Sequence, residues 1–125
     1  MLKVVFDGSM GAGTAAFFAP YADDPKTSGL LLFTVPELQR IVREADAAGL
    51  QLAVHAIGDR ANALVLDAFE KLPPSNRDRR LRIEHAQVVR REDLDRFKRL
   101  GVVASIQPSH AIDDMRWAEK RIGKE

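Results

Sequence analysis

Short apolar runs of strand length alternate along the whole chain with segments in which apolar residues recur at helical spacing. Strands are expected at residues 2–6, 50–55, 81–85 and 102–106. Helices are expected at residues 35–48, 61–72 and 91–100, with a last helix that starts at Asp113 or Asp114 and runs through Met115, Ala118 and Ile122. Strands that alternate with helices of this length form right-handed crossovers and a parallel sheet. We therefore predict an α/β protein.

Two arrangements of these units remain open, a doubly wound open sheet and an arc of a TIM (β/α)8 barrel. A complete barrel takes about 250 residues, so four βα units in 125 residues would make about half of one. Residues 1–125 are then one partial barrel domain. A half-barrel exposes two sheet edges and an unfilled face, which favours a homo-oligomer or pairing with the missing half.

Local signals mark the ends of the expected helices. Thr34 and Glu37 have the spacing of a capping box at the start of the first helix, and Gly49 is suited to end it. Asp59 has the place of an N-cap for the second helix. Gly101 closes the third helix.

Residues 8–33 form a long segment without clear periodicity after the first strand. Loops of this length in compact domains are functional or disordered. The glycines in this segment do not have the spacing of a dinucleotide motif or a P-loop, so nucleotide binding is weakly supported. Its four aromatic residues favour a lid over the strand ends instead.

Composition excludes several classes of protein. The 19 Lys and Arg residues nearly balance 18 Asp and Glu residues, and the charges are mixed along the chain, which argues against nucleic acid as a partner. No apolar run long enough for a membrane span and no signal peptide is evident, so we expect a cytoplasmic protein with no membrane partner. Because the chain has no cysteine, metal or acid–base chemistry must use histidine, carboxylates or lysine.

Two histidines occupy equivalent places in successive units. His55 and His85 each end an expected strand and lie 30 residues apart, close to one βαβ repeat. The carboxyl ends of parallel strands meet at one edge, where ligands bind, so the two imidazoles could hold a divalent ion there. The alternative is that they are hydrogen-bonded polar residues. His110, past the fourth strand, either faces the same edge or lies in a surface loop.

Lys3 lies inside the first expected strand. A lysine there is costly to bury unless it is paired or used chemically. The simpler interpretation is that the first strand is an edge and that Lys3 reaches solvent.

Five stretches occur in order along the chain and together resemble the metal-dependent amidohydrolases of family 3, the group that includes enzymes similar to N-substituted formamide deformylase. They are LKVVFDGS at 2–9, TAA at 14–16, VHAIGDRA at 54–61, RIEHAQ at 82–87 and SIQP at 105–108. The resemblance covers nearly the whole chain, and its specific parts are the two histidine-bearing stretches, HAIGD and RIEHAQ.

The resemblance implies a (β/α)8 barrel whose divalent metal, with zinc as the first choice, activates water to hydrolyse carbon–nitrogen bonds of amide-like small molecules. Carried over by position, His55 and His85 match the metal ligands of barrel strands five and six. Lys3 matches the lysine of strand four, which in some relatives is carboxylated and bridges two metals. Glu84 and Gln87, with Asp59 and His110, would surround these ligands or line the rim.

Two parts of the family's pattern have no counterpart in this chain. They are the paired histidines of barrel strand one and the strand-eight aspartate that activates water, and Asp113 and Asp114 do not match that aspartate. The chain therefore looks like strands four to seven of a barrel, a fragment. We expect it to bind metal weakly and to be inactive alone.

Two other functions stay open from the sequence. A non-catalytic α/β module could bind a small anion or a partner through its strand-end loops, with the glycine-rich loop of Gly8, Gly11 and Gly13 as an anion-binding nest. A self-associating module could pair through exposed sheet edges. Neither explains the ordered series of motifs.

Overall fold

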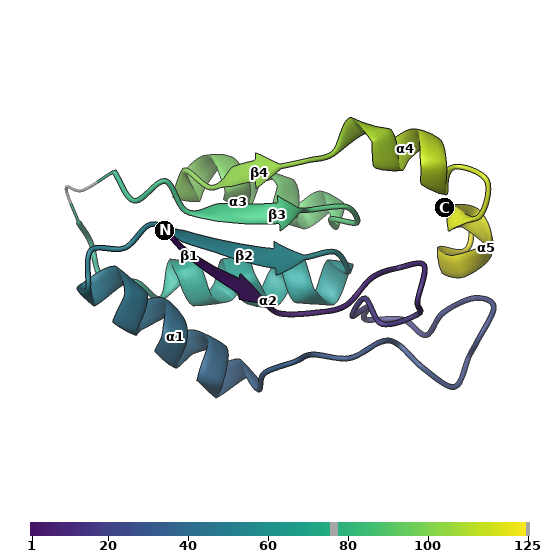
Figure 1. Cartoon of the computed structure of the whole chain (residues 1–125), viewed down its shortest axis with the longest axis horizontal. Coiled ribbons are helices and arrows are strands. Elements are labelled where there is room, and N and C mark those ends of the chain that lie inside the picture. Colours follow the sequence, from purple (N-terminus) through teal and green to yellow (C-terminus); the bar gives the residue numbers. More distant parts are fainter. Residues whose placement is uncertain (76–77, 125) are drawn as a thin grey trace.

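The computed structural model describes residues 1–75 and 78–124 and contains one four-stranded parallel sheet (Figure 1). Its strands, in spatial order, are β1 (Leu2–Val5), β2 (Leu52–Ala56), β3 (Arg82–His85) and β4 (Val103–Ser105). Each successive pair is parallel, as predicted.

Helices α1 (Val35–Ala47), α2 (Asp59–Glu70) and α3 (Arg91–Leu100) connect the strands in turn. The strands lie in the sheet in the same order as in the chain. A doubly wound sheet reverses its strand order at a switch point, and this sheet has no such reversal. The prediction of an α/β fold with a parallel sheet is confirmed.

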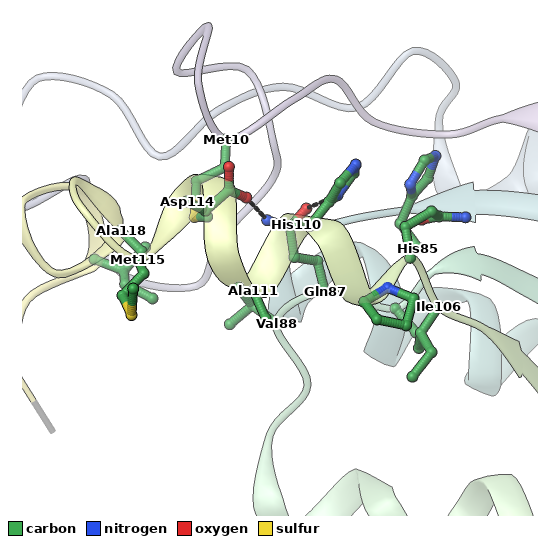
Figure 2. A pocket seen from close by; sticks show the side chains of 14 residues that line it. Met10, His85, Gln87, Val88, Ile106, His110, Ala111, Asp114, Met115 and Ala118 are labelled. Atoms are coloured by element: carbon green, nitrogen blue, oxygen red, sulfur yellow. Dashed lines mark hydrogen bonds between the residues drawn. The ribbon is translucent and has the colours of Figure 1, made fainter.

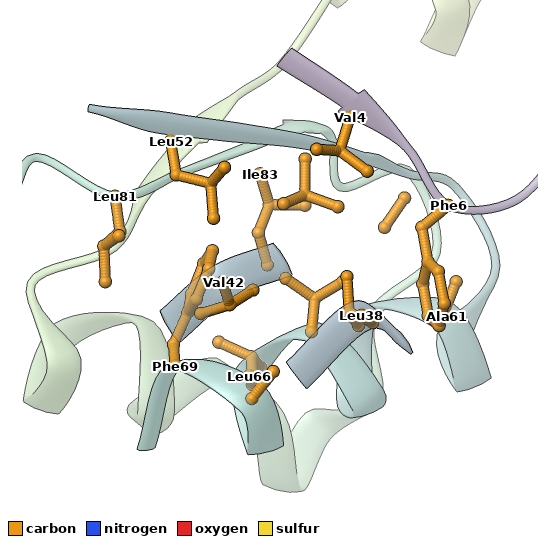
Figure 3. Close-up of a cluster of buried hydrophobic side chains, with 14 of the residues drawn as sticks. Val4, Phe6, Leu38, Val42, Leu52, Ala61, Leu66, Phe69, Leu81 and Ile83 are labelled. Atoms are coloured by element: carbon orange, nitrogen blue, oxygen red, sulfur yellow. The ribbon is translucent and has the colours of Figure 1, made fainter. Parts of the chain in front are cut away.

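The hydrophobic core lies between one face of the sheet and the helices (Figure 3). Val4, Val54 and Ile83 are neighbours in the register and point into this core, where they meet Leu38 of α1 and Leu66 of α2. Strand side chains alternate between faces, so the residues between these apolar positions lie on the opposite face. That face carries Lys3, His55 and Glu84.

The core also settles the orientation of β3. Ile83 is fully buried on the helix side, which places Arg82 and Glu84 on the open face of the sheet. Glu84 is in register with His55 of β2 and with Ser105 of β4.

The expected ends of α1 and α3 are confirmed. Thr34 caps α1 through the predicted capping box, in which Glu37 N–H donates to the Thr34 hydroxyl and the Glu37 carboxylate accepts from Thr34 N–H at 2.8 Å. Gly49 follows α1 and Gly101 ends α3, each with positive φ, 70° and 63°.

The last part of the chain differs from the prediction of one helix starting at Asp113 or Asp114. Helix α4 (Pro108–Asp114) begins earlier and ends where the predicted helix was to start, and α5 (Ala118–Ile122) follows after a short turn. Pro108 explains the early start. The fixed φ of proline suits the first turn of a helix, and the N–H that proline lacks would make no hydrogen bond within the helix at that position.

The segment 8–33 packs at the carboxyl ends of the strands, beside α4 and α5 (Figure 1). It forms a second hydrophobic cluster, here called the roof cluster, with the loops after β2 and β3 and with α5. The roof cluster consists of Met10, Ala15, Phe17, Tyr21 and Ile57, with Val88, Trp117 and Ala118 packed against it. Arg121 of α5 also joins this helix to the 8–33 segment, because its guanidinium donates to the carbonyl of Gly11 at 2.6 Å.

None of the helices in the described part of the chain is long and apolar enough to cross a membrane.

Candidate functional site

The two strand-end histidines lie together, as the sequence predicts. His55 on β2 and His85 at the end of β3 have ring centroids 4.5 Å apart, with an angle of 69° between the ring planes. Their backbones belong to adjacent parallel strands, so the sheet itself holds the pair. Rigid strand ends position side chains more precisely than loops do.

The ring of His55 is held from the side of the long loop. Its Nε2 lies 2.9 Å from the carbonyl oxygen of Gly8 and 3.4 Å from Oδ1 of Asp7. A carbonyl oxygen only accepts hydrogen bonds, so Nε2 of a neutral His55 carries the proton. The lone pair of that ring is then on Nδ1.

The surroundings of His85 keep its ring neutral. Burial lowers the pKa of His85, and the neighbouring His55 lowers this pKa further. Its Nδ1 is buried and has no hydrogen-bond partner. A buried imidazole nitrogen without a hydrogen bond costs free energy, so this nitrogen is a candidate ligand atom. The side chain of Gln107 is the neighbouring polar group, and it raises the pKa of His85.

The backbone at His85 is strained. His85 has φ 75° and Ala86 has φ 44°, a left-handed conformation that residues with a Cβ rarely adopt. The peptide N–H of Ala86 donates to the carbonyl of Ala56 at 3.1 Å, and this bond to the β2 end helps to hold the turn. Strained backbone of this kind clusters at functional sites.

We predict that Ala86→Gly raises the free energy of unfolding by about 1 kcal/mol, because glycine adopts positive φ without steric cost. The change is measured by urea denaturation. The matched control is Ala12→Gly, at an exposed position in the 8–33 segment whose φ is not positive; it should be neutral or destabilising. Equal effects of the two substitutions would contradict the strain argument.

Lys3 and Glu84 lie on the same open face as His55, on its two sides. Lys3 is exposed on β1, which is an edge strand in this chain, in agreement with the simpler interpretation. Glu84 accepts from Arg82 at 2.8 Å, and this pairing lowers the pKa of Glu84. Arg82 also donates to the hydroxyl of Ser105, so these polar groups form a chain across β3 and β4.

His110 faces the histidine pair and does not lie in a surface loop. It belongs to α4, and its ring stacks on that of His85 with centroids 5.7 Å apart and an angle of 11° (Figure 2). Gln87, in the loop after β3, makes two hydrogen bonds to α4. Its Oε1 accepts from His110 Nδ1 at 3.4 Å, and its Nε2 donates to Asp114. His85, Gln87 and His110 line one side of a cavity of about 380 Å³.

Asp59 does not cap α2. Gly58 is the N-cap residue and Asp59 is the first residue of the helix. The Asp59 carboxylate instead accepts from the N–H of Phe18 at 3.0 Å, which attaches the 8–33 segment to α2. The capping role falls to the carbonyl of Ala16, which accepts from Ala61 N–H.

Asp7 is the residue that the sequence interpretation missed. Its carboxylate is fully buried next to His55 and accepts three backbone N–H bonds, from Ala16, Ile57 and Gly58. The available signal was its position directly after a parallel strand, at the edge where ligands bind.

The residues present fit part of a metal centre. Two neutral imidazoles at rigid strand ends are the donor set that zinc accepts, but a catalytic zinc has three protein ligands. Across residues 1–75 and 78–124, no three His, Asp or Glu side chains gather into a group able to hold a metal ion. The pair alone therefore falls short of the three protein ligands of a catalytic zinc centre.

Comparison with known proteins settles the family. A family model described as "Amidohydrolase family" matches residues 1–125. The chain belongs to the amidohydrolase family. The resemblance inferred from the ordered motifs is thereby confirmed.

This amidohydrolase chain is similar to much longer proteins. It is 43% identical over 126 residues to Protein LONG AFTER FAR-RED 3 from Arabidopsis thaliana, a match that covers 99% of this chain and 22% of that protein. The N-substituted formamide deformylase of Arthrobacter pascens is 32% identical over 92 residues, which are 73% of this chain and 16% of that enzyme.

A solved structure gives the same result for the amidohydrolase fold. The crystal structure of an uncharacterized metal-dependent hydrolase from Pyrococcus furiosus superposes with a TM-score of 0.86 at 43% identity, over 98% of this chain and 25% of that one. The chain therefore spans about a quarter, or less, of the length of the proteins it matches.

Proposed function

We propose that this chain supplies two metal ligands, His55 and His85, to a hydrolase that cleaves carbon–nitrogen bonds of amide-like, non-peptide substrates. The observation that carries the proposal is the close pair of imidazoles at adjacent strand ends, with a buried and unpartnered nitrogen on His85. Membership of the amidohydrolase family and a metal-dependent hydrolase as structural neighbour support it.

The chain's own residues prepare the two ligands before any ion arrives. The carbonyl of Gly8 holds the proton of His55 on Nε2, which leaves Nδ1 free to donate its lone pair. Burial keeps His85 neutral, the state in which imidazole binds metals. Lys3, on the same face of the sheet, is the proposed third group, either as a free amine or carboxylated as a bridge between two ions.

When bound, a divalent ion, for which we propose zinc, supplies a Lewis acid for the scissile carbonyl and lowers the pKa of water toward about 7. Within the chain, His110 and Gln87 line the cavity beside the pair and are placed to orient an amide-like substrate. The group that takes the proton from water has no counterpart among the family motifs in this sequence. We propose that this chain is part of a longer protein and that the catalytic base belongs to another part of it.

We infer that the sheet edges are where the longer protein continues the barrel. Both β1 and β4 are edge strands within this chain, and the open face carries Lys3, Arg82 and Glu84 instead of an apolar layer. Further strands beside β1 and β4 would close the sheet and bring in the missing ligands.

The proposal is tested by hydrolysis assays with N-substituted formamides and simple amides. The longer protein that contains this segment should hydrolyse members of this set, and a chelator, His55→Gln or His85→Gln should each reduce kcat/KM by at least about 100-fold. The 125-residue chain alone should show no metal-dependent hydrolysis. Substantial hydrolysis by that chain, abolished by His55→Ala, would overturn the assignment of an incomplete centre.

A further inference from the structure

We infer that Asp7 is a positioning residue for the site: it fixes the ring of His55 and fastens the 8–33 segment over the histidine pair through one buried carboxylate. The inference extends the proposed function, in which His55 is a ligand, to a residue that has no place in the ligand set.

The hydrogen bonds of Asp7 join three separate parts of the chain. Its Oδ2 accepts from Ala16 N–H at 3.0 Å and from Gly58 N–H at 2.9 Å, and its Oδ1 accepts from Ile57 N–H at 3.0 Å. Asp7 itself follows β1, Ala16 is in the long segment, and the other two residues connect β2 to α2. One carboxylate therefore sets the distance between the long segment and the end of β2.

The same carboxylate reaches the histidine pair. Oδ1 lies 3.4 Å from Nε2 of His55, on the same side of the ring as the carbonyl of Gly8. Because Asp7 and Gly8 are consecutive, anchoring Asp7 also anchors that carbonyl. The Gly8 carbonyl accepts from Nε2, and the Asp7 carboxylate 3.4 Å away favours the proton on the same nitrogen. Together they restrict rotation of the ring, as the polar partners of ligand histidines do in metal sites.

The side chain has no access to water that could replace these bonds. Asp7 is 0% exposed, so each N–H that donates to it would lose its hydrogen-bond partner if the carboxylate were removed. Asn is nearly isosteric but supplies one acceptor oxygen in place of two. In an Asp7→Asn variant, the new NH₂ group faces either the backbone N–H groups or the N–H of His55, and neither can accept from it.

The test uses the metal-free 125-residue chain with ¹⁵N-labelled histidine rings, so it does not depend on whether the proposed function is correct. In the native chain we expect one neutral form of His55, with its proton on Nε2 and slow exchange of that proton with water. In Asp7→Asn this slow exchange should be lost, and the N–H groups of Ala16, Ile57 and Gly58 should exchange at least about tenfold faster.

Asp59→Asn is the matched control. Asp59 also accepts an N–H from the 8–33 segment, that of Phe18, but it has no contact with His55 among its hydrogen bonds. The Asp59→Asn substitution should leave the His55 signal and the exchange rates of the three backbone N–H groups unchanged. If Asp7→Asn does not fold, the native spectrum still tests the inference: a proton on Nδ1, or fast exchange of the Nε2 proton with water, overturns it.

A change confined to the backbone amides, with the His55 signal intact, would also overturn the positioning role, because it would reduce Asp7 to a structural anchor. If the native chain gives the expected His55 signal but does not bind zinc in a separate titration, that result would count against the proposed function alone.

Discussion

Alanine in place of Gly58 is expected to lower the free energy of unfolding by about 3 kcal/mol. A Cβ built at Gly58 lies 2.0 Å from the carbonyl oxygen of Ala16, far inside contact distance, and both partners are backbone atoms that cannot rotate away. The long segment must therefore move off the start of α2. That movement breaks the Asp7 hydrogen bonds to Ala16 and Gly58 and removes the cap on Ala61 N–H.

Urea denaturation measures this loss, and Gly11→Ala is the control. Gly11 lies in the same segment, and the nearest atoms to a Cβ there are ring carbons of Trp117 at 3.7 Å, an ordinary contact. We expect a change within about 0.5 kcal/mol for this control, as at other uncrowded surface positions. Similar losses in the two variants would mean that the segment is not packed tightly on Gly58.

The second large effect is expected in α3, where Asp93→Ala should lower the free energy of unfolding by about 3 kcal/mol. The Asp93 carboxylate is 2% exposed and accepts from Arg90 at 2.7 Å and from Arg96 at 2.8 Å. Arg96 also binds Asp67 and Glu70 of α2. Removing Asp93 leaves cations without their buried partner and loosens α3 from α2.

Glu92→Ala is the control for charge alone. Its carboxylate also pairs with Arg90, at 3.2 Å, but it is 66% exposed. Exposed pairs contribute little, so the loss should be no more than about 0.5 kcal/mol. Thermal or urea unfolding of both variants distinguishes the two cases, and a small loss for Asp93→Ala would contradict the buried network.

The part of the fold that follows from local periodicity could be predicted from the sequence. Alternating strands and helices are encoded by side chains a few residues apart, and the capping box of Thr34 and Glu37 is visible as spacing alone. The meeting of His55 and His85 was also predictable, because parallel strands place equivalent residues at the same edge.

Most of the errors and omissions depend on contacts between distant segments, whereas the early start of the last helix has a local cause in Pro108. Asp59 has the local signature of a cap, but the carbonyl of Ala16, far away in the chain, takes that role. The three hydrogen bonds of Asp7 join residues that are nine to 51 positions apart in the sequence, and no local sequence pattern predicts them. His110 reaches His85 because α4 starts early at Pro108.

The competing interpretation as an anion-binding module loses its main support in the structure. In its proposed nest, the glycine-rich loop, Gly8 N–H donates to the carbonyl of Thr14, Ser9 N–H to the Thr14 hydroxyl and Gly13 N–H to the carbonyl of Met10. Amides that already donate within the loop are not available to an anion. Family membership points the same way, to hydrolase chemistry.

The most direct test of the central claim, that His55 and His85 form half of a metal centre, is a calorimetric zinc titration of the purified chain. We predict binding of one equivalent, weak because the other ligands are absent, that is lost in the double variant His55→Ala, His85→Ala and kept in His110→Ala. Identical heats for the native chain and the double variant would contradict the claim.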